Sequence, residues 1–125
     1  MTFVRAFIAA LALIAVGCGS ATPVSVATVA MGEFTIDPSS RVLAAGDVTL
    51  ELVNEGDLPH TIVITRHTGE VVVASDVLQG GEAADLVVGL EPGEYEFTCR
   101  IVAEFDGELF DHYELGMVTS VTVEG

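Results

Sequence analysis

The sequence predicts a single all-β domain of the β-sandwich type. From Val24 onward the apolar residues recur with a period of two, which is the period of a strand that buries one face. Turn signals interrupt this alternation roughly every eight to twelve residues, as they do in sandwiches of short strands. No segment shows a convincing helical stripe, and 125 residues leave room for one domain.

Each predicted strand is a run of alternating apolar and polar residues between two turns. In chain order, these runs cover residues 24–36, 48–52, 60–65, 70–74, 83–88, 94–99 and 117–123. The turns and loops that separate them lie at residues 37–40, 45–47, 54–59, 80–81 and 91–93. Each of these contains Gly or Pro, the residues that most strongly favour a reversal of the chain.

The start of the chain differs in composition from this domain. Arg5 precedes an apolar run at residues 6–16, which has the length of a signal-peptide core rather than of a membrane span. The run ends in small residues directly before Cys18, and this pattern resembles a bacterial lipobox, in which the cysteine is lipidated and becomes the new N-terminus. An ordinary signal peptide with an incidental cysteine is the alternative. The expected organisation is a cleaved signal peptide at 1–17, a lipidated tether at 18–23 and the domain at 24–125.

The charge of the chain is strongly negative. The sequence has 19 Asp and Glu against 4 Lys and Arg, which gives a formal net charge of −15. Residues 1–17 contain Arg5 and no acid, so the chain from Cys18 onward would carry −16. Such a charge argues against binding to nucleic acid and against adhesion to anionic lipid surfaces. It fits an exported protein that is kept soluble by its charge or that docks with basic partners.

Four residues form a candidate metal site. Cys99 ends the predicted strand 94–99 and His60 begins the strand 60–65, and each continues a row of apolar residues that should face the core. His112 and Met117 follow in the next loop. A thiolate, two imidazoles and a thioether are the ligand set of a blue-copper site. A buried inert thiol, with a histidine that is merely part of the core, is the alternative.

The order His…Cys…His-x4-Met in a short all-β chain resembles the cupredoxins. The segments 53–60, 90–99 and 112–118 carry this resemblance, which extends over about residues 31–123. It implies a Greek-key sandwich of about seven to eight strands that holds one type 1 copper ion. In the same family pattern His60, Cys99 and His112 are the equatorial ligands, Met117 is the axial ligand, and the backbone N–H of Thr61 donates to the cysteine sulfur.

The segment between Cys99 and His112, residues 100–111, is longer than in many small cupredoxins. It contains the acids Glu104, Asp106, Glu108 and Asp111 together with the apolar residues Phe105, Leu109 and Phe110. One interpretation is an acidic docking surface with aromatic contacts, beside an exposed edge of His112 where electrons would leave. The other is a solvated hairpin whose apolar residues cap the domain.

The function that these observations favour is electron transfer rather than catalysis. We expect a monomeric, lipid-anchored copper protein on the outer face of the bacterial cytoplasmic membrane, which carries one electron between membrane-associated redox proteins. Those partners are expected to have a basic docking surface. A copper-binding module that stores or delivers the ion without redox shuttling is the first alternative, and a metal-free interaction domain is the second.

The lipobox interpretation predicts a membrane-attached product. The mature protein should begin at Cys18 and partition into the detergent phase, because a diacylated cysteine with an amide-linked chain gives lasting attachment where a single chain does not. Detergent partitioning and the mass of the N-terminal peptide measure this. The variant Cys18→Ser should lose the attachment and Cys99→Ser should keep it. Soluble wild-type protein that begins at another residue would contradict the prediction.

Overall fold

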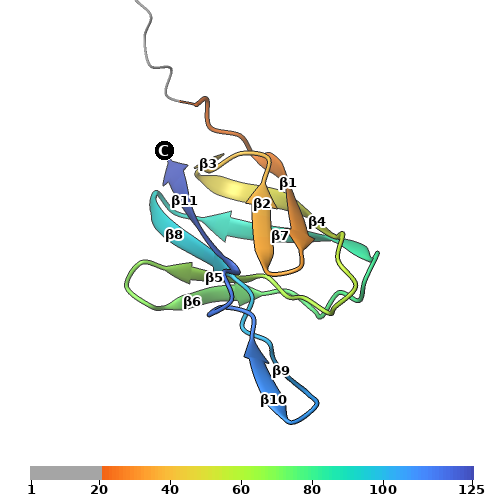
Figure 1. Ribbon diagram of the computed structural model, residues 1–125. Coiled ribbons are helices and arrows are strands. Elements are labelled where there is room, and N and C mark those ends of the chain that lie inside the picture. Colours follow the sequence, from red (N-terminus) through yellow and green to blue (C-terminus); the bar gives the residue numbers. More distant parts are fainter. Residues whose placement is uncertain (1–20) are drawn as a thin grey trace, which may run out of the picture.

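The computed structural model describes residues 21–125, and within this range the chain forms eleven strands in two packed sheets and one projecting hairpin (Figure 1). The predicted all-β sandwich is therefore confirmed, with more strands than the expected seven to eight. The predicted signal peptide at 1–17 and the lipidation site Cys18 lie outside the described residues. Among residues 21–125 there is no helix long and apolar enough to cross a membrane.

The two layers of the sandwich contain four and five strands. The first sheet has the order β2–β1–β4–β7 and consists of β1 (Val26–Gly32), β2 (Thr35–Pro38), β4 (Gly46–Asn54) and β7 (Ala83–Leu90). The second sheet has the order β3–β11–β8–β5–β6 and consists of β3 (Val42–Ala44), β5 (Val63–Arg66), β6 (Val71–Ala74), β8 (Gly93–Thr98) and β11 (Val118–Glu124). β1 runs parallel to β4 and β3 runs parallel to β11, so the chain must cross between the sheets rather than turn back in simple hairpins.

The core lies between the sheets and is built by the alternation seen in the sequence. Val48, Leu50 and Leu52 of β4 and Tyr95 and Phe97 of β8 are all at most 2% exposed. Burial of an aliphatic side chain of this size contributes roughly 1.5–3 kcal/mol. The central strands β4 and β8 are thereby fixed in register, and the positions of their ends are fixed with them.

The first predicted strand is wrong in one respect. Residues 24–36 are not one strand, because the chain reverses after β1 and returns as β2, with Gly32 paired to Thr35. Phe34 in this reversal has a φ of 61°, a left-handed conformation that residues other than glycine seldom adopt. The sequence does indicate this reversal, because the buried apolar residues occupy odd-numbered positions up to Met31 and an even-numbered position at Ile36.

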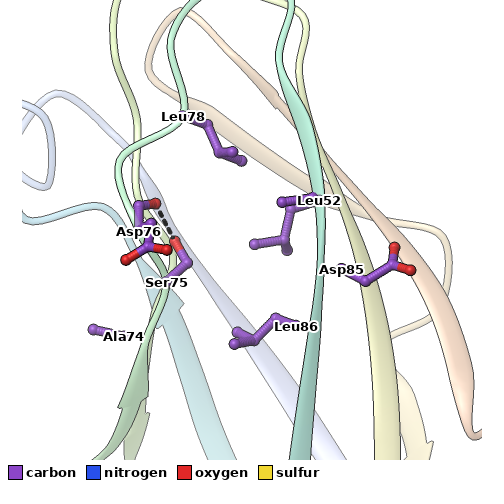
Figure 2. A pocket seen from close by; sticks show the side chains of 8 residues that line it. Leu52, Ala74, Ser75, Asp76, Leu78, Asp85 and Leu86 are labelled. Atoms are coloured by element: carbon purple, nitrogen blue, oxygen red, sulfur yellow. Dashed lines mark hydrogen bonds between the residues drawn. The ribbon is translucent and has the colours of Figure 1, made fainter.

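The long segment between Cys99 and His112 forms a two-stranded hairpin, β9 (Val102–Phe105) and β10 (Glu108–Asp111). Figure 1 shows that it projects from the end of the sandwich opposite to the first described residues and the C-terminus. At the same end, a pocket of about 150 Å³ opens between the sheets, with Leu52 and Leu86 on one side and Ser75, Asp76 and Leu78 on the other (Figure 2). The chain segment that forms this second side also positions a candidate ligand.

Candidate metal centre

His60 is held by the backbone just before β5 begins. Its N–H donates to the carbonyl of Leu78 at 3.0 Å, and the N–H of Leu78 donates back to His60 at 2.8 Å. Two further bonds join Ile62 and Ser75: the N–H of Ser75 donates to the Ile62 carbonyl, and the N–H of Ile62 donates to the Ser75 hydroxyl. The segment that lines one side of the pocket in Figure 2 therefore holds the backbone of His60 in place through these bonds.

Cys99 directly follows β8, and the loop with the other candidate ligands is tied to it. The N–H of Cys99 donates to the carbonyl of Met117 at 3.1 Å, and the N–H of Met117 donates to the carbonyl of His112 at 3.0 Å. The N–H of His112 in turn donates to the carbonyl of Ile101 at 3.0 Å. These bonds bring the backbones of all three residues together at the end of β8, although the hairpin separates them in the sequence.

The donor atoms of His60, Cys99 and His112 converge, and all three lie within 4.8 Å of one another. The Nδ1 atoms of the two imidazoles are 3.3 Å apart, and Nδ1 of His112 is 3.5 Å from Sγ of Cys99. Two donors that bind one ion at about 2 Å and about 110–120° apart are separated by about 3.3–3.5 Å. The three side chains thus have the spacing of ligands to a single metal ion.

The whole cluster is shielded from solvent. Cys99 and His60 are 0% exposed, and His112 is 1% exposed. Burial lowers the pKa of His60, the neighbouring His112 lowers it further, and Glu33 acts in the opposite direction. Burial also lowers the pKa of His112, against the opposing effect of Glu33 and Asp111. Both imidazoles are therefore neutral near pH 7, the form in which a histidine binds a metal.

Met117 is fully buried beside the two donors to which its backbone is bonded. A thioether here adds a soft donor to a set that already contains one thiolate and two imidazoles. Its role as the axial ligand stays a prediction. Thr61 lies next to the cluster: its N–H donates to Sγ of Cys99 at 3.5 Å, and its hydroxyl is 3.9 Å from the same sulfur. Both groups can stabilise a thiolate at this position.

The edge of His112 is not exposed, contrary to the expectation from the sequence. The ring of Phe34 packs edge-on against His112, with the ring centres 5.4 Å apart. Beside it lies a pocket of about 320 Å³ that is open to solvent and is lined by Phe34, Leu58, Ala103, Phe105, Phe110 and His112. The hairpin thus contributes three side chains to this pocket, while Phe105 and Leu109 remain 75% and 72% exposed, so the choice between a docking surface and a cap stays open.

One polar residue near the cluster was missed by the sequence analysis. Glu33 lies in the reversal between β1 and β2, and its Oε2 is 3.6 Å from Nε2 of His60. An isolated glutamate within the predicted strand 24–36 gave no indication that its side chain would approach a histidine. Recognition of the turn at Gly32 would have placed it at the same end of the sandwich as His60.

Comparison with known proteins identifies the family. The sequence matches the model of the cupredoxin-like domain over residues 4–110, and the chain belongs to this family, which confirms the resemblance inferred from its motifs. A search of curated proteins gives no match.

Two solved structures have the same fold. Reduced auracyanin from Roseiflexus castenholzii is 18% identical, with 83% of this chain and 100% of that chain covered and a TM-score of 0.62. Auracyanin A, a blue copper protein from Chloroflexus aurantiacus, is 17% identical, with 79% and 99% covered and a TM-score of 0.57. At these identities the likeness describes the fold. The family and the converging donors His60, Cys99 and His112 together define one type 1 copper ion as the cofactor.

The lowered pKa values of the two buried histidines predict that the metal-free protein loses stability in mild acid. Because protonation is harder in the folded state, the unfolded chain binds more protons as the pH falls below about 6.5, the ordinary pKa of histidine. Stability is thus fully present above this pH and declines as the pH falls toward the lower folded values. Denaturant unfolding at pH 7.5 and 5.5 measures the decline.

A pair of variants separates the buried histidines from the rest of the titrating groups. His112→Gln should flatten the pH dependence, whereas the same substitution at the exposed His67 should leave it unchanged. Equal slopes for wild type and His112→Gln would show that acids, rather than the buried imidazoles, control the stability in this range.

Proposed function

We propose that this protein is a one-electron carrier that uses a single copper ion bound by His60, Cys99, His112 and Met117. The observation that supports this best is the convergence of two Nδ1 atoms and one thiol sulfur, all within 4.8 Å of one another and all buried. The chemistry that copper supplies in such a donor set is the reversible gain and loss of one electron.

The surrounding residues hold the donors in one arrangement. The His60–Leu78 bridge, the bond from Cys99 to Met117 and the bond from Met117 to His112 fix the backbone of every ligand. Thr61 donates to the sulfur, and Phe34 packs against the ring of His112. A site whose ligands cannot move must keep nearly the same geometry in both oxidation states, and this keeps the reorganisation on electron transfer small.

The buried position of the donors also weighs against the alternative of copper storage and delivery. Transfer of an ion to another protein requires that the receiving ligands reach it, yet His60 and Cys99 are 0% exposed and His112 is 1% exposed. An electron needs no such opening, because it can pass through the ring of His112 and the apolar residues above it.

The hairpin is the surface that we propose for contact with a redox partner. Glu104, Asp106 and Glu108 are exposed on it, close to the exposed side chains of Phe105 and Leu109. Apolar contacts surrounded by charge of one sign suit a transient partner of the opposite charge. The proposed partner is accordingly a redox protein with a basic docking surface.

The proposed lipid anchor fits this orientation. The first described residues enter the sandwich at the end opposite to the hairpin (Figure 1). A chain that is tethered to a membrane through Cys18 would thus direct the hairpin and the copper end away from the lipid surface. We propose that the protein is exported and works on the outer face of the cytoplasmic membrane.

Two substitutions test the ligand roles. Cys99→Ser should abolish the intense visible band of the copper-loaded protein, because a hydroxyl cannot replace the soft thiolate. Met117→Leu should keep copper bound and raise the reduction potential, because the axial donor that stabilises the oxidised ion is lost. Absorption spectra and voltammetry are the measurements. Loss of copper from both variants to the same extent would show that Met117 is more than a weak axial ligand.

A matched pair of triple variants tests the docking surface. Electrostatic steering raises association rates by about 10- to 1000-fold at low salt, so electron transfer to a basic acceptor protein should slow as ionic strength rises. The hairpin variant Glu104→Gln, Asp106→Asn, Glu108→Gln should weaken this salt dependence. Asp106 becomes Asn because its φ is 52°, a conformation that Asn tolerates.

The control variant neutralises three exposed acids at the opposite end of the sandwich: Asp47→Asn, Glu94→Gln and Glu124→Gln. It changes the net charge by the same amount and should leave most of the salt dependence in place. If both triple variants weaken the salt dependence equally, the attraction comes from the overall charge of the protein, and the hairpin is not the docking site.

A further inference from the structure

The reversal between β1 and β2 lies against both histidine ligands. Glu33 and Phe34 are the two residues that the pairing of Gly32 with Thr35 leaves in the turn. Phe34 packs against His112 with ring centres 5.4 Å apart, while the carboxylate of Glu33 extends to the loop before His60. Two adjacent residues of one turn thus lie against the two histidines, with Phe34 in a left-handed conformation.

The carboxylate of Glu33 has a fixed position. Its Oε1 accepts hydrogen bonds from the N–H groups of Asp57 and Leu58, the latter at 3.1 Å. The loop that carries these donors is itself ordered by Asn54, whose Oδ1 accepts the N–H of Gly56 at 2.9 Å. With one oxygen held in this way, the other oxygen of Glu33 has little freedom.

Gly56 shows how closely the three groups fit. A Cβ atom at this position would lie 2.5 Å from Oε1 of Glu33 and 3.3 Å from Nε2 of His60. Any side chain here would displace the carboxylate from the imidazole. The absence of a side chain at Gly56 therefore gives the carboxylate of Glu33 room to approach the imidazole of His60.

Nε2 of His60 has no hydrogen-bond partner among the described residues, although it is fully buried. The nearest carboxylate oxygen is Oε2 of Glu33 at 3.6 Å, a few tenths of an ångström beyond a hydrogen bond. A proton on Nε2 would be drawn to this oxygen, and Nδ1 would then keep its lone pair. It is Nδ1 that is 3.3 Å from Nδ1 of His112, inside the donor cluster.

We propose that Glu33 is a positioning residue, whose carboxylate keeps the proton of His60 on Nε2 and so presents Nδ1 to the copper ion; this rests on the copper site proposed above. Carboxylates that accept the second ring N–H of a ligating histidine fix its tautomer and raise its basicity. The negative charge of Glu33 also favours the oxidised ion, which carries one more positive charge, so it lowers the reduction potential.

The substitution Glu33→Gln gives a sharp test because it changes an acceptor into a donor. The N–H groups of Asp57 and Leu58 would keep the amide oxygen, so the NH₂ group would point at Nε2 of His60 and favour the proton on Nδ1. In the metal-free protein, ¹H–¹⁵N correlation spectra of the imidazoles should show the Nε2–H tautomer of His60 in wild type and its loss in Glu33→Gln. Copper affinity, measured by competition with a chelator, should fall by about 10- to 100-fold.

The control is Glu55→Gln, which removes the same charge from an exposed residue of the same loop. It should leave the tautomer and the affinity unchanged. Glu33→Asp provides a second variant: it keeps the charge but is too short to bond the loop and reach His60, so the tautomer preference should also be lost. The reduction potential should rise in Glu33→Gln by more than in Glu55→Gln.

The proposal is overturned if the tautomer of His60 is the same in wild type, Glu33→Gln and Glu33→Asp, or if Glu55→Gln lowers copper affinity as much as Glu33→Gln. A raised potential in Glu33→Gln with an unchanged tautomer also overturns it, because Glu33 would then act through charge alone. The tautomer is measured in the metal-free protein, so its result does not depend on the copper site. A wild-type protein that fails to form a blue copper site would refute the proposed function without affecting this measurement.

Discussion

The structure depends on one constraint: three donor atoms from distant parts of the chain must stay within 4.8 Å of one another in a space closed to water. Buried imidazoles lose hydration, and a buried polar group without a partner costs roughly 1–3 kcal/mol. The backbone bonds around His60 and Cys99 resist the separation that would relieve this cost. Asn54 adds to them, since its amide donates to the carbonyls of Leu58 and Leu78 and so joins the two segments that flank His60.

Much of this arrangement is visible in the sequence because strands have a strict period of two. Once Tyr95 and Phe97 are assigned to the core, Cys99 must point the same way, and the burial of all three confirms this. The same argument places His60 with Ile62 and Ile64. The odd or even position of a residue determines the face of the sheet on which its side chain lies. Its place at the start or the end of a strand determines the end of the sandwich at which it lies. Together they predict the convergence of His60 and Cys99 without any knowledge of contacts.

The parts that the sequence did not predict depend on chain reversals and on side-chain reach. The turn at Glu33 and Phe34 follows from a left-handed φ at a phenylalanine, which no propensity favours. The approach of Glu33 to His60 depends on a flexible side chain that reaches across the end of the sandwich, and period-two patterns carry no information on that. The burial of His112 was likewise missed, because it depends on the ring of Phe34, which packs against it from the turn after β1.

The pairing of the hairpin strands divides their side chains between two faces. Ala103 pairs with Phe110, and Glu104 pairs with Leu109. Successive residues of a strand point to opposite faces, so Ala103, Phe105 and Phe110 lie on the face that lines the pocket beside His112, and Glu104 and Leu109 lie on the other face. The docking surface that we propose therefore takes Glu104 and Leu109 from one face of the hairpin, whereas Phe105 belongs to the face that lines the pocket. On this proposal, a change at Glu104 or Leu109 would alter the contact with a partner and leave the residues around His112 in place, whereas a change at Phe105 would affect both.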